Sequence, residues 1–172
     1  RCVHGDCELV GDLQTYAITR AKDNRIFRRF MAANVLTHRP PLGFFRRFVQ
    51  ESDGSHSEGL NLKHRGIVPI TGLVRIRALE CGITEANTYR RMKLATASGG
   101  MNENDASSLR DALRLINLIR LNHQSTQLMA GDEPTHFVPI EDLSPLLRRN
   151  LKAAFMLVEE AQQALASRYQ VL

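Results

Sequence analysis

Three side chains that can carry positive charge stand next to one another in this sequence, at Lys63, His64 and Arg65, directly before Gly66. A helical pattern of apolar residues follows, and Pro69 suits its first turn, where a helix needs no amide donor. The free N–H groups and the dipole at a helix N-terminus favour negative charge. The stretch therefore predicts a basic turn that leads into a helix N-terminus and is suited to holding an anion.

Other cations of the chain are expected near this turn, because a helix break precedes it and a hairpin before residue 60 would fold back onto it. The candidate anion-binding residues are His38, Arg39, Arg46, Lys63, His64, Arg65, Arg75 and Arg90. The alternative is that these side chains cap carbonyl groups and pair with Glu80, Glu85 or Asp105, which would make them structural. The sequence leaves both interpretations open.

The motifs that carry common catalytic chemistry are absent from the sequence. It contains no G-x-S-x-G, no H-E-x-x-H, no P-loop and no paired CxxC. A polymerase-like nucleotidyltransferase needs a Gly-Ser pair before a D-x-D, whose two carboxylates hold Mg²⁺ on the triphosphate. Gly54-Ser55 is the one Gly-Ser pair, and no D-x-D follows it. The acidic pairs at 141–142 and 159–160 diverge along the chain and indicate surface charge, so we predict no catalytic residue.

The composition is that of an ordinary globular protein, with 43% hydrophobic and 24% charged residues. No apolar run approaches the roughly 20 residues that span a bilayer, and the first six residues do not resemble a signal peptide. Three cysteines, Cys2, Cys7 and Cys81, favour a reducing cytoplasm over a disulfide framework. Cys2, His4 and Cys7 match no standard zinc spacing. We expect a cytoplasmic protein with neither a metal nor a membrane partner.

The net charge of +5 indicates an anionic partner, although only weakly. The basic residues are scattered in pairs, and tryptophan is absent. Single-stranded nucleic acid is bound by aromatic side chains interleaved with basic ones, and the aromatic residues here do not form such a platform. Nucleic acid is therefore a less favoured partner than a small anionic ligand.

Apolar periodicity predicts six helices, with the longest at about 102–130 and the last from residue 144 onward. Their start signals are Asp6, Asp23, Pro69, Thr84, Asn102 and Ser144-Pro145. The longest helix has apolar residues around much of its circumference and is expected to be central. The last places apolar residues at alternating spacings of four and three, which is typical of antiparallel helix packing. His123 lies on an apolar face and is interpreted as a core histidine whose hydrogen bonds are satisfied.

Residues 42–49 are aromatic and β-branched, and a polar tip separates them from residues 60–62. The two segments are predicted to pair as a small β-hairpin, although 44–48 could equally form a helical turn. The predicted fold class is therefore all-α, a bundle of about six helices with a small β-hairpin.

Two longer motifs, residues 38–46 and 62–70, resemble the family described as the putative nucleotidyltransferase substrate-binding domain. Shorter matches are Asn87-Thr88, His123-Gln124 and 143–145 followed by Arg148-Arg149 and Leu151-Lys152. The pattern of Arg1, Val3, Gly5, Asp6 and Leu9 resembles the end of a preceding nucleotidyltransferase domain. The resemblance implies that residues 1–36 are the C-terminal end of that domain, packed on the bundle, and that 37–172 form the helical substrate-binding domain.

The resemblance also implies an all-α fold like the C-terminal helical halves of nucleotidyltransferases. Family members occur in bacterial signal-transduction proteins, often with cyclic-nucleotide-binding and CBS modules upstream. The implied function is non-catalytic binding of an anionic nucleotide, phosphate-bearing ligand or protein acceptor. Mg²⁺ and a nucleoside triphosphate would belong to the upstream catalytic domain, so this chain should be inactive alone. The alternative is a helical protein-interaction or dimerisation module of a signalling protein, possessing only structural cations and forming a homodimer.

Two positions depart from the family pattern. Asn61 and Gly72 stand where the family commonly has an acid. Lys63 and Arg75 would consequently have fewer partners within the chain. This either frees the two cations for a ligand or weakens a structural pairing.

Overall fold

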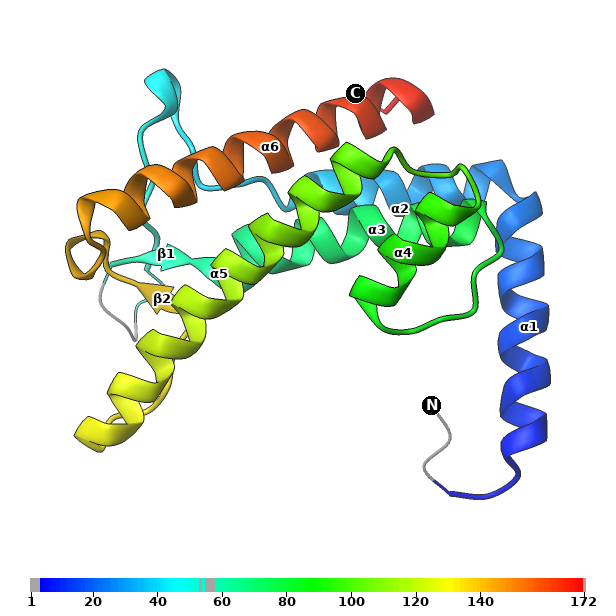
Figure 1. Cartoon of the computed structure of the whole chain (residues 1–172), viewed down its shortest axis with the longest axis horizontal. Coiled ribbons are helices and arrows are strands. Elements are labelled where there is room, and N and C mark those ends of the chain that lie inside the picture. Colours follow the sequence, from blue (N-terminus) through cyan, green and yellow to red (C-terminus); the bar gives the residue numbers. More distant parts are fainter. Residues whose placement is uncertain (1–3, 53, 55–57, 172) are drawn as a thin grey trace.

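The computed structural model describes residues 4–52, 54 and 58–171, which form an all-α bundle of six helices (Figure 1). The helices are α1 (Cys7–Asp23), α2 (Arg25–Thr37), α3 (Val68–Glu80), α4 (Thr88–Ala97), α5 (Glu103–Ala130) and α6 (Pro145–Tyr169). The short elements are η1 (Phe44–Arg46), β1 (Leu60–Asn61), η2 (Lys63–Ile67), β2 (Phe137–Val138) and η3 (Ile140–Asp142). The predicted fold class is confirmed. The predictions that involve Arg1, Cys2, Val3 and Ser55 concern residues outside the described ranges.

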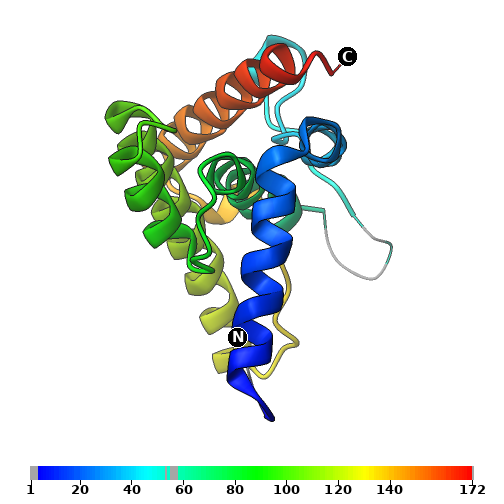
Figure 2. The same ribbon diagram turned by 90° about the vertical axis from the view of Figure 1, so that its right-hand side faces the viewer.

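Helix α3 is the element around which the others are arranged. It packs against α1, α2, α4 and α6, and Figure 2, which looks along it, shows it surrounded by the other helices. The longest helix, α5, has neighbours on several sides as predicted, namely α4, α6 and η2, although it is less central than α3. Its second half extends past the bundle, and Leu118, Leu121 and Leu128 of α5 are exposed.

The predicted helix caps are confirmed where a polar side chain can bind an N–H group two or three residues ahead. Asp6 Oδ1 accepts from Glu8 N at 2.8 Å, Asn102 Oδ1 from Asn104 N at 2.8 Å, and Ser144 Oγ from Leu147 N at 3.3 Å. Two predicted starts are displaced. α2 is capped by Asn24, with Asp23 ending α1, and α4 is capped by Asn87, three positions after Thr84.

We predicted that residues 63–66 form a basic turn before the helix. They belong instead to the helix itself. η2 is π-helical and continues directly into α3, and Asn61 Oδ1 accepts from His64 N at 3.1 Å at its start. Gly66 is buried, and a Cβ there would approach Ile116 Cγ2 to 2.9 Å. The glycine therefore lets this first turn lie close against α5.

The predicted strand pairing between residues 42–49 and 60–62 is wrong. β1 pairs antiparallel with β2, with Leu60 opposite Val138. Residues 44–46 form a short helical turn, which was the alternative, closed beneath by a bridge between Leu42 and Phe48. A bridge between Glu51 and Gly59 closes the polar tip.

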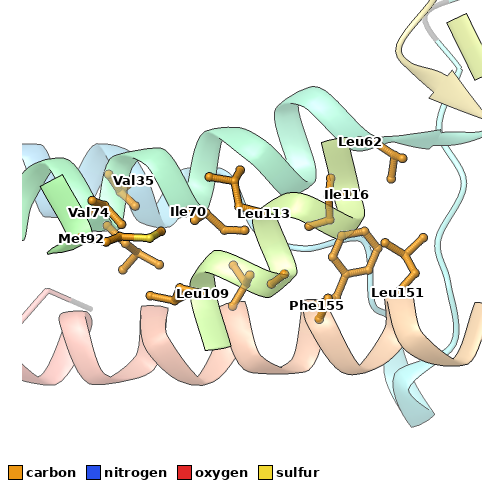
Figure 3. Close-up of a cluster of buried hydrophobic side chains, with 14 of the residues drawn as sticks. Val35, Leu62, Ile70, Val74, Met92, Leu109, Leu113, Ile116, Leu151 and Phe155 are labelled. Carbon is orange, nitrogen blue, oxygen red and sulfur yellow. The ribbon is translucent and has the colours of Figure 1, made fainter. Parts of the chain in front are cut away.

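One continuous apolar core holds the bundle together. Phe155 of α6 lies beside Ile116 of α5 near one end, and Met92 of α4 lies beside Val74 of α3 near the other (Figure 3). The predicted face of α6 is confirmed, because its buried residues include Leu151, Ala154, Val158 and Leu165.

Helix α1 projects away from this core at one end of the molecule (Figure 1). Ala21 is its one buried residue, while Leu9, Leu13 and Tyr16 form an exposed apolar stripe. Within the described part of the chain, no helix has the length and apolar character needed to cross a bilayer.

Candidate functional site

Four side chains that can carry positive charge converge near the start of η2, and we call them the cationic cluster: Lys63, His64, Arg120 and His136. The hydrogen bond from Leu62 N to His136 O, at 3.0 Å, places Lys63 beside His136. Burial lowers the pKa of His136, and the positive charges of Lys63, Arg120 and His64 lower it further. Lys63, Arg120 and His64 are therefore each close enough to His136 to disfavour its protonated form.

Two buried donor or acceptor atoms in this region lack a partner. Arg120 Nε and His123 Nε2 are buried and make no hydrogen bond within the described ranges. His123 Nδ1 is 3.9 Å from Asp142 Oδ2, so the interpretation of His123 as a fully satisfied core histidine is wrong. His136 Nδ1, by contrast, is 3.1 Å from Gln124 Nε2. Buried polar groups are nearly always hydrogen-bonded, so these two atoms of α5 are exceptions within the described chain.

No carboxylate of the described residues forms an ion pair with a member of the cationic cluster. Neither Asn61 nor Gly72, the two positions where an acid was expected from the resemblance, supplies a carboxylate to Lys63 or Arg75. Asn61 caps the helix without adding charge. At Gly72 a Cβ would lie 2.5 Å from Val35 Cγ2, so no larger side chain fits there without a shift of α2. Within the described ranges, Lys63 and Arg75 form no ion pair with a carboxylate.

Four of the predicted site residues lie elsewhere. Arg65 forms an ion pair with Glu51, Arg90 lies 3.5 Å from Glu85, Arg46 Nη1 lies 3.4 Å from Met156 Sδ, and Arg39 lines a separate hollow beside α6. The alternative of pairing with Glu80, Glu85 or Asp105 describes Arg90, whereas Arg65 pairs with Glu51, a carboxylate that the alternative did not name.

His38 and Arg75 border a groove that begins at the cationic cluster. The ring of His38 stacks on that of His64, with centroids 6.2 Å apart and planes 29° from parallel. The groove between α2 and α3, about 400 Å³, starts there, and we call it the α2–α3 groove. It is lined by Phe27, Phe30, Met31, Asn34, Val35, His38, Val68, Thr71, Gly72 and Arg75. It thus joins exposed aromatic rings to uncompensated cations.

Arg75 in this groove is exposed and unpaired within the described chain. Burial lowers the pKa of Arg91, and the charge of Arg75 adds to that effect. Two guanidinium groups that repel one another create a positive potential at this side of the groove.

A second hollow, about 350 Å³, lies between α3, α5 and α6 and also contains arginines, Arg77 and Arg168. Both are already bound to Glu80: Arg77 Nη1 donates to Oε2 at 3.0 Å and Arg168 Nε to Oε1 at 2.8 Å. Tyr169 also donates to Glu80 Oε1, at 2.6 Å, and accepts from Arg28 Nε at 3.1 Å. We call these five residues the Glu80 network; each member is hydrogen-bonded to another member, although its three arginines outnumber its one carboxylate.

Sequence reasoning missed two members of the cationic cluster, Arg120 and His136. Arg120 lies three residues after Asn117 and four before Gln124, so its place on the polar stripe of α5 could have been predicted. His136 gave no signal, since it reaches the cluster through the β1–β2 pairing, which joins segments about 76 positions apart.

Comparison with protein families finds one match. The chain matches the family model described as "Putative nucleotidyltransferase substrate binding domain" over residues 25–169. The chain belongs to this family. No curated protein and no solved structure matches it. The region shared with the substrate binding domain family runs from the start of α2 to the end of α6 and includes both the cationic cluster and the α2–α3 groove.

Proposed function

We propose that this domain binds a nucleotide, with its phosphate at the cationic cluster and its ring in the α2–α3 groove, for a nucleotidyltransferase domain of the same protein. The observation that carries the proposal is the convergence of Lys63, His64, Arg120 and His136 without a described carboxylate partner. Elsewhere in the bundle, partly buried cations such as Arg77 and Arg65 are paired. A phosphate would supply the missing negative charge.

The chemistry of the cluster suits a phosphate. A guanidinium group can bind two oxygens of one phosphate through parallel N–H donors, and a lysine adds a compact charge. Arg120 supplies the guanidinium group of the cluster. Neutral His136 would gain a proton as the anion binds, because a nearby negative charge raises a histidine pKa.

The α2–α3 groove suits the ring of the ligand. Phe30 is 72% exposed and Phe27 is 45% exposed, so both rings are accessible from solvent. Aromatic faces stack on nucleobases. Asn34 and Thr71, in the same lining, offer an amide and a hydroxyl to the polar edge of a base.

Transfer itself is assigned to another domain. It requires paired carboxylates that hold Mg²⁺ on a triphosphate, and the sequence contains no Gly-Ser followed by D-x-D. We assign residues 1–36 to the end of that preceding domain. This boundary stays a prediction, as do the CBS and cyclic-nucleotide-binding modules and the role in bacterial signal transduction, and the family match itself includes α2.

Calorimetric titration of the 172-residue chain with inorganic phosphate, ribose 5-phosphate, AMP and adenosine tests the proposal. We expect AMP to bind at least about tenfold more tightly than ribose 5-phosphate, a difference of about 1.4 kcal/mol. Lys63→Ala should weaken every phosphate-bearing probe, whereas Phe30→Ala should weaken AMP alone.

Lys93→Ala is the matched control, because Lys93 is an exposed lysine of α4 away from the cluster. Absence of binding by all four probes would contradict the proposal. Equal weakening by Lys63→Ala and Lys93→Ala would show that only the net charge matters.

A second candidate function, a helical interaction or dimerisation module, is favoured by one observation. The apolar stripe of α1, Leu9, Leu13 and Tyr16, is exposed. A dimer formed through this stripe should dissociate in the variant Leu13→Glu, as measured by sedimentation velocity over a range of concentrations. A wild-type chain that is monomeric at all concentrations excludes this candidate as a homodimer.

A further inference from the structure

The tip of the loop between α2 and β1 exposes two adjacent phenylalanine rings. Phe44 and Phe45, in η1, are 86% and 81% exposed, and their rings contact each other edge to face with centroids 4.8 Å apart. Figure 1 shows this loop rising beyond α6, on the outside of the bundle. The tip is therefore a convex apolar surface rather than the wall of a pocket.

The backbone of the tip is strained, and packing of the exposed rings does not compensate for it. Phe45 and Arg46 have φ values of 61° and 54°, in the left-handed region that bulky side chains rarely adopt. The tip is held from beneath, where Gly43 N donates to Arg47 O at 2.8 Å and the ring of Phe48 lies 6.2 Å from that of Phe155. The fold thus anchors the base of the tip while both rings remain in water.

Five basic residues surround the base of this tip. Arg46 and Arg47 follow it in the chain, and the first turns of α6 contribute Arg148, Arg149 and Lys152; all five line one open hollow beside Phe48 and Ile140. None of the five forms an ion pair with a described carboxylate. Arg148 donates to the carbonyls of Leu143 and Glu141 instead. Glu141 and Asp142 of η3 are the nearby acids, and they are fewer than the five basic residues, so the net charge of this region is positive.

We infer that this face, the two phenylalanine rings with the five basic side chains beneath them, docks onto an anionic lipid surface. Aromatic rings at the level of the headgroups gain apolar contact, while arginine and lysine attract anionic lipids. The convex shape favours a membrane over single-stranded nucleic acid, whose bases need ring faces lying open in a groove. Here the two rings already contact each other. The inference does not depend on the proposed nucleotide site.

Sedimentation of the 172-residue chain with vesicles tests the inference. The vesicles are pure phosphatidylcholine, or phosphatidylcholine with about a third phosphatidylserine, at low and at physiological salt. We expect binding to the anionic vesicles alone. Phe44→Ser with Phe45→Ser should weaken it at least about tenfold, since two apolar side chains leave the interface. Arg47→Gln or Arg149→Gln should each weaken it about fivefold.

Two control variants match these changes. Leu128→Ser with Met129→Ser removes exposed apolar side chains at the far end of α5, and Lys93→Gln removes an exposed cation of α4. Circular dichroism confirms folding of each. Absence of vesicle binding overturns the inference, as does equal binding by the phenylalanine variant, which would indicate unspecific charge attraction. Tighter binding to a single-stranded oligonucleotide than to anionic vesicles, lost with the same phenylalanine variant, would also overturn it.

Discussion

The two ends of the helical segment formed by η2 and α3 differ in how their charged side chains are partnered. At the C-terminal end, Glu80 accepts from Arg77, Arg168 and Tyr169, and Tyr169 accepts from Arg28. At the N-terminal end, the cationic cluster contains four basic groups and no described carboxylate partner. The side chains of the Glu80 network hydrogen-bond to one another and so hold the helices in position. The side chains of the cationic cluster have no described carboxylate partner and so are available to a ligand.

Burial explains why the Glu80 network must be complete. The side chain of Glu80 is 10% exposed, and transferring a carboxylate from water to such a site costs several kcal/mol unless donors surround it. Burial by itself raises the pKa of Glu80, but the hydrogen bonds from Tyr169, Arg77 and Arg168 and the charge of Arg77 outweigh it, so the pKa lies below its ordinary value. In the cationic cluster, Lys63 and His64 remain exposed, so water solvates them until an anion arrives.

The largest expected effect on the free energy of unfolding comes from breaking the Glu80 network. Glu80→Gln removes the charge that Arg77 and Arg168 share, and we expect a loss of about 2–4 kcal/mol in the free energy of unfolding. Urea denaturation measures it. Glu133→Gln, in the exposed connector after α5, should change the same quantity by less than about 0.5 kcal/mol. Equal effects of the two variants would contradict the contrast between the two ends.

The two ends should lose their contributions to stability at different pH values as the solution is acidified. The pKa of His136 is lower in the folded chain than its unfolded value of about 6.5. As the pH decreases below about 6.5, the unfolded chain is therefore protonated first, and the free energy of unfolding decreases. The pKa of Glu80 is also lowered, so its contribution is lost further down, as pH falls below about 4.5. His136→Asn should remove the first decline and keep the second.

Thermal unfolding at closely spaced pH values, with and without phosphate, measures both declines. Phosphate bound at the cluster should raise the pKa of His136 and reduce the first decline. A first decline that His136→Asn leaves unchanged would mean that another group causes it.

A smaller effect on stability is expected from a substitution in the cationic cluster. Lys63→Ala removes one of several like charges, so we expect the free energy of unfolding to change by less than about 0.5 kcal/mol or to increase slightly. Urea denaturation measures the change. A loss as large as that of Glu80→Gln would show that Lys63 has a structural partner, and the comparison between the two ends would fail.

The variant with the smallest expected effect on stability, Asn61→Asp, gives the most direct test of the difference between the two ends. Asn61→Asp keeps an equally good helix cap but adds a carboxylate beside Lys63, so stability should hold while phosphate affinity falls. Asn87→Asp is the matched control, because Asn87 caps α4 through the same bond, from Arg90 N at 3.1 Å. Calorimetry with inorganic phosphate measures the affinity. Equal phosphate affinities of the two variants would argue against binding at the cluster.

Part of the candidate site could be predicted from the sequence. Lys63 and His64 stood out because three basic residues adjoin, and His38 was correctly placed with them. Arg65 and Arg90 were predicted as ligand-binding residues but pair with carboxylates: Arg90 with Glu85, which the alternative had named, and Arg65 with Glu51, which it had not. Arg46 was expected at the same site and instead lies at the base of the phenylalanine tip.

The sequence by itself determined what depends on neighbours within a few residues. Asp6, Asn102 and Ser144 cap helices because their side chains reach N–H groups two or three positions ahead, and the apolar spacing of α6 set its buried face. Tertiary structure alone decided that β1 pairs with β2 and that His136 and Arg120 join Lys63. Such contacts link distant segments, and their free energy comes from packing and charge that exist once the bundle has formed.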